Sequence, residues 1–394
     1  MKKFVLFLFV LMTLVSCQKQ QKEQKEQKEP GYIVQVALGH WKPTQYTPEQ
    51  IIGRLDTVTQ LIPVEKVVIG WSLDMDLYRK VGEYLHSKGI RMMLWLPLFA
   101  ETEQVCDNSP AVDLWGRTPA NYDQAAANAF RFNCPSDSSN LANVLAIYDR
   151  MFSKIGFDGV FLDRVRTQSF VCGVGGVLSC GCPLCVKRFA AEGVDIEKVK
   201  SEYESKGDAF FSVSGYNPAD GFIFENPLAA SFFKAKSRIV SSSVVAIVDS
   251  LHSRNLEVGL DLYAPFMAPF VGQDYAILAK HADFIKPMLY RQTNAPAGMG
   301  YEYELLRKTL PGATGYPEIK MDVDFLNSQL DAMEPYSCGK YPGIEINYHE
   351  EYAPTTPEYV SESLTAVKNH GFDGAVLSWN IMEVPLSHLE ALKQ

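Results

Sequence analysis

The sequence predicts an α/β fold, namely a (β/α)8 barrel of the TIM type with a large insertion after the fourth strand. Two observations support it: eight short apolar segments recur along residues 31–394, and stretches with apolar residues at helical spacing separate them. An open doubly wound sheet is the alternative. However, no G-x-G-x-x-G follows the first strand and no G-x-x-x-x-G-K-[ST] occurs anywhere in the chain. Strands that alternate regularly with helices therefore favour the closed barrel.

Each expected strand is a buried-strand pattern bounded by turn signals. The eight segments are 31–39, 64–71, 90–99, 157–163, 256–263, 284–290, 341–349 and 372–379. The phrase Gly-Phe-Asp-Gly precedes both the fourth strand, at 156–159, and the eighth, at 371–374, so each time a glycine ends a helix and leads into a strand. Residues 167–235 lack clean periodicity and are interpreted as an inserted subdomain over the active site, with a second insertion at 100–140.

The N-terminus has the pattern of a bacterial lipoprotein signal peptide, residues 1–17. A short cationic region precedes an apolar run that is too short to span a bilayer comfortably. The following Leu-Val-Ser-Cys resembles a lipobox, which implies that cleavage leaves Cys17 as a diacylated N-terminus. The alternative is an ordinary secretory signal with an accidental cysteine. Residues 18–30 contain no apolar residue and predict a flexible tether, so we expect a lipid-anchored protein of the bacterial cell envelope, at the periplasmic or outer-membrane surface.

Composition limits the classes of partner. The chain is 47% hydrophobic and 12% aromatic, which supplies ample core material. Its formal net charge of -9 argues against a nucleic-acid partner. Many aromatic side chains combined with mild acidity fit a neutral, ring-shaped ligand. We therefore expect a carbohydrate substrate, a membrane contact through the lipid anchor and no nucleic acid.

Strand phase predicts where the carboxylates gather. In a (β/α)8 barrel the working face is the C-terminal end of the strands, and successive side chains alternate between the lumen and the helices. On the seventh strand Glu345, Asn347 and His349 alternate with apolar residues, which places a polar row inward. Asp163 ends the fourth strand and Asp261 lies on the fifth in the inward phase. These carboxylates are therefore expected to converge on one pocket.

Other polar and aromatic residues are expected around that pocket. The predicted substrate-binding residues are Glu101, Arg166, Tyr290, Arg291, Asn347, His349 and Trp379. Trp379, at the end of the eighth strand, is the tryptophan we favour as a stacking platform for a sugar ring. His349 is interpreted as a hydrogen-bonding residue rather than a metal ligand, because no H-x-x-x-H or H-E-x-x-H accompanies it.

Two carboxyl groups that face one pocket are the minimum apparatus for glycoside hydrolysis. One protonates the leaving oxygen while the other attacks the anomeric carbon or activates water, and burial with mutual repulsion separates their pKa values. The candidate catalytic residues are Asp163, Asp261 and Glu345. As alternatives, Asp163 is a structural partner of Arg164 or Arg166, and the other two are satisfied buried carboxylates.

A glycoside hydrolase that acts on a poly- or oligosaccharide is the function that this pattern favours. The first alternative is a glycan-binding lipoprotein whose glycosidase barrel has lost catalysis. The second is a barrel hydrolase acting on an ester or amide, which no G-x-S-x-G motif supports.

Residues 156–163, GFDGVFLD, resemble the fourth-strand signature of several barrel glycosidase families. These include the family 114 polygalactosaminidases and the α-amylase-like enzymes, in which the terminal Asp is catalytic, so the resemblance implies a catalytic role for Asp163. The family 18 chitinase pattern D-G-x-D-x-D-x-E is similar. However, Phe161 and Val165 stand in place of its first inner Asp and its catalytic Glu. A substrate-assisted mechanism of the chitinase type is therefore disfavoured.

Cysteines cluster in the loop after the fourth strand, where C-x-C-x-x-C supplies three thiolates of a tetrahedral zinc site from one turn. The predicted ligands are Cys172, Cys180, Cys182 and Cys185, with Cys106 and Cys134 as competitors for the fourth place. Four thiolates leave no open position for water, so this zinc is expected to staple the loop that walls the pocket rather than to catalyse. Disulfides, natural outside the cytoplasm, are the alternative, and the 8 cysteines including Cys17 leave an odd thiol under pure pairing.

The same cysteine run, followed by Phe189, resembles the C-x-C-x-x-C-x-x-x-F zinc loop of the family 42 β-galactosidases, which lies beyond strand four of their barrel. Those enzymes use a glutamate pair, with the acid/base after strand four and the nucleophile at the end of strand seven. The resemblance offers a counterpart for the nucleophile alone, in Glu345. The substrate of that family is therefore not carried over.

Overall fold

The computed structural model describes residues 31–39, 44–101, 106–118, 131–218 and 221–393. The signal peptide, Cys17 and the tether lie outside these residues, so their roles stay predictions. Within the described ranges, no helix combines the length and the apolar character that crossing a bilayer requires.

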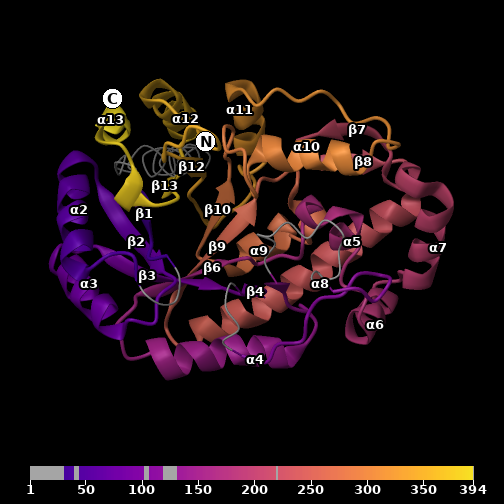
Figure 1. Cartoon of the computed structure of the whole chain (residues 1–394), viewed down its shortest axis with the longest axis horizontal. Helices are drawn as coiled ribbons and strands as arrows, with labels where there is room; N and C mark the ends of the chain where they lie inside the picture. Colours follow the sequence, from indigo (N-terminus) through magenta and orange to yellow (C-terminus); the bar gives the residue numbers. More distant parts are fainter. Residues whose placement is uncertain (1–30, 40–43, 102–105, 119–130, 219–220, 394) are drawn as a thin grey trace, which may run out of the picture.

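Eight parallel strands close into a barrel, as the sequence predicts (Figure 1). Each strand pairs with the next in chain order, and the eighth pairs back with the first. The strands are β1 (Gly31–Ala37), β2 (Val64–Gly70), β3 (Arg91–Pro97), β6 (Gly159–Asp163), β9 (Glu257–Tyr263), β10 (Phe284–Met288), β12 (Gly343–Glu345) and β13 (Gly374–Ser378). A short strand, β11 (Gly339–Lys340), pairs with the start of β10.

Helices cover the outside of the barrel. They are α2 (Pro48–Leu61), α3 (Met75–Ser87), α4 (Ser138–Ile147), α8 (Pro227–His252), α9 (Tyr275–His281), α10 (Met299–Thr309), α11 (Val323–Asp331), α12 (Pro357–Asn369) and α13 (Leu386–Glu390). The start of α2 is a capping box between Thr47 and Gln50, as the Thr-Pro signal predicts. Gly89 follows α3 with φ of 70°, a backbone conformation that only glycine adopts at little cost.

Apolar side chains form two separate clusters. The larger one lies between the strands and the helices, and it includes Val34, Val36, Ile344 and Ile346. The smaller one fills the barrel lumen; its buried members are Ile33, Val68, Met93, Trp95, Phe161, Phe284, Tyr341 and Val376. The alternation along β1 and β13 matches the expected strand phase. The barrel is therefore packed at its centre, and a site is possible only at an end.

The insertion after β6 carries more regular structure than its sequence suggests. It contains α5 (Gly173–Val177), α6 (Pro183–Ala191), α7 (Ile196–Lys206) and the hairpin of β7 (Val213–Asn217) with β8 (Gly221–Phe224). Its core is a set of contacting aromatic rings rather than a periodic stripe, for example Phe211 against Tyr203, Phe210 and Phe233. In the other insertion, β4 (Ala100–Glu101) pairs with β5 (Arg131–Phe132). Figure 1 shows α6 and α7 on the side of the molecule away from α2 and α3.

Candidate active site

A pocket of about 490 Å³ lies at the C-terminal end of the barrel. Its wall is made by Ala37 of β1, Trp95 of β3 and residues that follow β1, β2, β6, β12 and β13. The aromatic members are Trp71, Trp95, Tyr348, Tyr352 and Trp379; polar members include Gln45, Arg164, Asn347, His349, Asn380 and Glu383. Flat apolar faces interspersed with hydrogen-bonding groups are suited to a sugar ring.

The aromatic wall is held in place by its own contacts. The rings of Trp71 and Trp95 lie 4.6 Å apart, and Trp379 stacks at 6.3 Å on Tyr290, which is buried behind it. Asn347 fixes the backbone at Trp379, because its Oδ1 accepts the main-chain N–H groups of Trp379 at 2.7 Å and of the next residue at 2.9 Å. The platform predicted at Trp379 therefore lines the pocket, and Asn347 and Tyr290 hold it in place.

Asp163 lies beside this wall at the end of β6. Its side chain is 15% exposed, and its Oδ2 accepts the indole N–H of Trp95 at 3.2 Å. The guanidinium of Arg164 lies 4.0 Å from the same oxygen and 5.4 Å from the ring centre of Trp71. Asp163 itself does not line the pocket, but its partners Trp95 and Arg164 do, and its side chain is partly exposed.

Asp261 lies next to Asp163 but deeper. It is 4% exposed, and the Nζ of Lys286 lies 3.0 Å from its carboxylate and donates to the hydroxyl of Tyr290 at 2.6 Å. Burial raises the pKa of Asp261 to about 7; Lys286 opposes this rise, and the charge of Asp163 adds to it. Burial alone would lower the pKa of Lys286, but Asp261 and Tyr290 together hold it above its usual value. The charge of Asp163 is therefore close enough to act on Asp261.

Glu345 is held by a different set of groups. It is completely buried, and its Oε1 accepts the main-chain N–H of Gln292 and the hydroxyl of Tyr359, each at 2.7 Å. Burial raises its pKa to about 7, while the two hydrogen bonds and Arg291 oppose the rise. These partners come from the loop after β10 and from α12. The structure thus brings Asp163 and Asp261 together and anchors Glu345 elsewhere.

Two arginines predicted to bind substrate are engaged in other contacts. Arg291 is buried and donates to Glu362 at 2.7 Å and to Ser363 at 2.8 Å, both on α12, so it does not line the pocket around which it was expected. Arg166 is also buried; its guanidinium stacks on the rings of Phe132 and Tyr263 and acts on Asp261. An arginine next to a strand end has a long reach, so sequence position alone does not fix where its charge lies.

The remaining predicted binding residues fall into two groups. Asn347, His349 and Trp379 line the pocket, and the ring of His349 stacks on Tyr352 at 3.4 Å. Glu101 belongs to β4, but its side chain lies outside what the structure describes. Substrate binding by all of these residues stays a prediction.

Several wall residues are not among the predicted binding residues. Trp71 and Arg164 each directly follow a barrel strand, so the rule that sites lie at strand C-termini was enough to find them. Glu383 gives no comparable signal. It reaches the pocket through the turn after β13, where it accepts the hydroxyl of Tyr46 at 2.8 Å and the amide of Asn380 at 3.0 Å.

The expectation that the cysteine loop walls this pocket is wrong. Among the described residues, none of 167–235 lines it, and the insertion packs instead around α8 and α10. The sequence indicated a long insertion after the fourth strand, but it did not indicate against which part of the barrel this insertion packs.

The cysteine cluster forms, but one of its four members differs from the predicted set. The sulfur atoms of Cys134, Cys180, Cys182 and Cys185 all lie within 4.8 Å of one another, and no disulfide joins them. Cys172 is not part of this group; it ends a 3-10 turn and is buried where Arg166 and Glu302 act on its thiol. Cys134, one of the two competitors, takes the fourth place because the loop that follows β5 lies against the C-x-C-x-x-C turn.

Comparisons with known proteins identify the fold. No protein-family model and no curated protein matches the sequence. Among solved structures, the glycoside hydrolase domain of PgaB (BpsB) from Bordetella bronchiseptica is 15% identical with a TM-score of 0.62, over 92% of this chain and 98% of that one. The α-L-fucosidase isoenzyme 2 from Paenibacillus thiaminolyticus is 12% identical with a TM-score of 0.53, over 91% of this chain and 48% of that one. The chain thus has the (β/α)8 barrel fold found in glycoside hydrolase domains.

Proposed function

We propose that the protein is a glycoside hydrolase that acts on a poly- or oligosaccharide. The observation that carries this proposal is the position of Asp163, a partly exposed carboxylate at the C-terminal end of β6 that is hydrogen-bonded to the pocket-lining Trp95. Catalytic groups of barrel enzymes occupy this end of the strands, and aromatic faces of the kind found in the wall bind sugar rings.

In the proposed reaction Asp163 is the ionised carboxylate. It either attacks the anomeric carbon directly or takes a proton from the water that does so. Asp261 is the proton donor to the glycosidic oxygen, so that the bond from the anomeric carbon to that oxygen breaks as the proton arrives. A pKa of about 7 keeps a large share of Asp261 protonated near neutral pH, which is what a general acid needs.

The donor role of Asp261 requires a particular position of the bound sugar. Because Asp261 is only 4% exposed, the bound sugar must reach the mouth of the lumen between the two aspartates. Glu383 is the second candidate for proton donor, because it is an exposed carboxylate in the pocket wall. Substrates with good leaving groups need little protonation, so they distinguish a lost donor from a lost nucleophile.

A glycan-binding protein without catalysis is the competing function, and one observation favours it. Asp261 is paired with Lys286, and ion pairs that serve structure alone also shift pKa values. The test is a panel of glycans offered to the wild-type protein, with reducing ends measured for hydrolysis and calorimetry for binding. We expect release of reducing ends from at least one glycan. Binding without any turnover would replace the hydrolase proposal by the binding one.

We also propose that Cys17 carries the lipid that anchors the protein to the cell envelope. The supporting evidence is the signal and lipobox pattern of residues 1–17. Membrane fractionation tests it: Cys17→Ser is expected to move the protein to the soluble fraction, and an unchanged membrane fraction would contradict the anchor.

A further inference from the structure

We infer that Cys134, Cys180, Cys182 and Cys185 bind one Zn²⁺ ion, which ties the two insertions of the barrel to each other. The inference rests on the geometry and charge of the cluster, and it is independent of the proposed glycoside hydrolase activity. Because Cys134 follows β5 and the other three follow β6, the ion would join segments that are about 50 residues apart in sequence.

The spacing of the sulfur atoms matches a tetrahedral zinc–thiolate site. Four thiolates about 2.3 Å from a central zinc ion lie roughly 3.8 Å from one another. Here all four sulfurs are within 4.8 Å, with Cys134 at 3.3 Å from Cys182 and 3.6 Å from Cys185. Disulfides would join the sulfurs in pairs, whereas Cys134 has two neighbours at similar distance. The mutual arrangement of all four is what a single ion requires.

Main-chain groups around the cluster favour thiolates. Cys182 precedes α6, and its sulfur accepts the main-chain N–H of Cys185 at 3.5 Å. The sulfur of Cys180 accepts the N–H of Val112, also at 3.5 Å. Such donors stabilise the ionised ligand and orient it toward a metal.

A buried lysine lies beside the cluster. Lys236 is 1% exposed, and its Nζ donates to the main-chain oxygens of Val177 at 2.6 Å and of Phe270 at 2.9 Å. Within the described ranges no carboxylate forms an ion pair with it, and burial lowers the pKa of Lys236 to about 7. Zinc with four thiolates would carry a net charge of -2 and favour the charged form of this lysine, whereas neutral disulfides would not.

The two insertions already run side by side at the cluster. Gly181 donates its main-chain N–H to Val112 at 2.8 Å, and Leu114 donates to Leu178 at 3.1 Å. The ion would therefore lock an existing contact rather than bring distant segments together. Four protein ligands leave no open position for water or substrate, so its role is structural.

Two substitutions of buried cysteines test the ligand set, one inside the cluster and one outside it. We expect purified wild type to contain about one zinc per chain by mass spectrometry of the metal. Cys134→Ser is expected to lose this zinc, while Cys172→Ser keeps it. Co²⁺ added to chelator-treated wild type is expected to give the thiolate-to-metal absorption of a tetrahedral site, a readout that needs no variant.

Three results would overturn the inference. They are reduced wild type that contains no zinc and binds no Co²⁺, disulfides within the cluster found by mapping unreduced peptides, and zinc that depends on Cys172 rather than Cys134. If Cys134→Ser fails to fold, the cobalt spectrum and the peptide map of the wild type still decide the question.

Discussion

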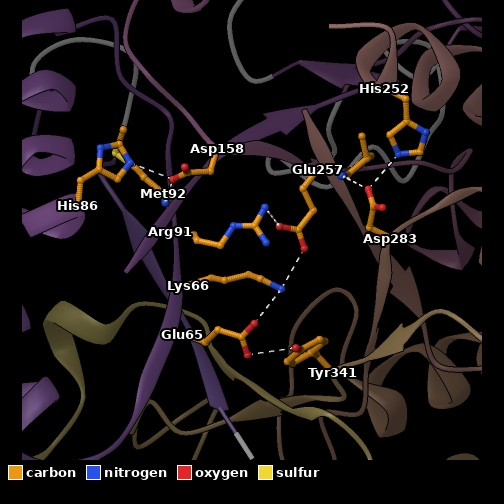
Figure 2. A network of polar contacts seen from close by, with 11 residues as sticks. Glu65, Lys66, His86, Arg91, Met92, Asp158, His252, Glu257, Asp283 and Tyr341 are labelled. Atoms are coloured by element: carbon orange, nitrogen blue, oxygen red, sulfur yellow. Dashed lines mark hydrogen bonds and ion pairs between the residues drawn. The ribbon is translucent and has the colours of Figure 1, made fainter. Parts of the chain in front are cut away.

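At the N-terminal end of the barrel, Lys66 lies 2.9 Å from Glu257 and 3.5 Å from Glu65, and these partners close the charge off from solvent (Figure 2). At the C-terminal end, Asp163 retains accessible surface beside an aromatic pocket. Both ends concentrate charged residues, but at the N-terminal end these residues form ion pairs with one another. The comparison shows that charge alone does not distinguish the candidate site. What distinguishes it is a partly exposed carboxylate, that of Asp163, beside an aromatic pocket.

The N-terminal end is a polar floor under the lumen. The ammonium of Lys66 lies over the rings of Phe284 at 4.7 Å and Tyr341 at 4.8 Å, and Arg91 pairs with the same Glu257. Figure 2 shows the side chains of Lys66, Arg91 and Glu257 pointing toward one another from the starts of their strands. Charge pairs at this end of a barrel serve its stability rather than chemistry.

A repeated aspartate clamp sets the strand register at this end. The carboxylate of Asp158 accepts the main-chain N–H of Met92 at 2.7 Å and lies 2.9 Å from a ring nitrogen of His86 (Figure 2). Asp283 makes the same pair of contacts with Val258 and His252. Asp373 accepts the N–H of Lys340 at 2.9 Å. The aspartates of the two Gly-Phe-Asp-Gly phrases are therefore structural, although each precedes a strand that ends in the pocket region.

The largest expected effect is a loss of hydrolysis when the carboxylate at the C-terminal end is removed. Asp163→Asn keeps the shape of the side chain but removes the negative charge, so hydrolysis should fall by about 10²–10⁴-fold while sugar binding persists. Steady-state kinetics on a glycan that the wild type cleaves measure this. Wild-type activity in this variant would move the chemistry to another residue of the barrel.

The next effect concerns pH and distinguishes two buried carboxyls of similar pKa. Asp261 and Glu345 both have pKa values raised to about 7, but only Asp261 lies next to Asp163. We expect kcat/KM to fall as the pH rises through about 7, because the donor loses its proton. Asp261→Asn should abolish this alkaline limb, measured with a good leaving group, and Glu345→Gln should keep it. The reverse pattern would transfer the donor role to Glu345, and an intact limb in both variants would exclude both residues as the donor.

The same two groups affect stability with a definite sign. Because their folded pKa values lie above the unfolded ones, the folded protein binds more protons between about pH 4 and 7. Their contribution to the free energy of unfolding is therefore fully present below about pH 4 and is lost as the pH rises to about 7. Urea titrations across this range are expected to show a shallower pH dependence for Asp261→Asn than for wild type. An identical dependence would mean that Asp261 has an ordinary pKa.

A smaller effect, on stability alone, is expected at the polar floor. Glu257→Gln removes the main partner of the buried Lys66 and should lower the free energy of unfolding by about 3 kcal/mol without changing kcat/KM. Glu304→Gln, in the exposed pair with Lys308, is the matched control and should cost less than about 0.5 kcal/mol. Equal losses in chemical denaturation would show that the floor contributes no more than surface pairs.

Much of this architecture was predictable because it depends on local periodicity. All eight strands occur where apolar runs and turn signals placed them, and alternation correctly put Asp163 and Asp261 at one end. Alternation did not show that Glu345 is bound by Gln292 and Tyr359, which lie 53 and 14 residues away. A side chain's face follows from its strand, but its partners follow from loops whose paths the sequence pattern does not encode.

The cysteine cluster illustrates the same limit. Cys172 is nearer in sequence to the C-x-C-x-x-C turn, yet Cys134 is the thiol that joins it. The difference arises because a 3-10 turn buries Cys172 elsewhere, while β5 directs the following loop toward α6. Motif spacing predicted three of the four sulfurs, and tertiary contact decided the fourth.

The most direct test of the difference between the two ends uses the two aspartates that flank β6. Asp158→Asn and Asp163→Asn make the same chemical change on either side of one strand. The free energy of unfolding and the rate of glycan hydrolysis are measured for both variants. We expect Asp158→Asn to lose about 1 kcal/mol of stability at unchanged activity, and Asp163→Asn to lose activity at unchanged stability. Loss of activity in both variants to the same extent, or in neither, would contradict the assignment of chemistry to the C-terminal end.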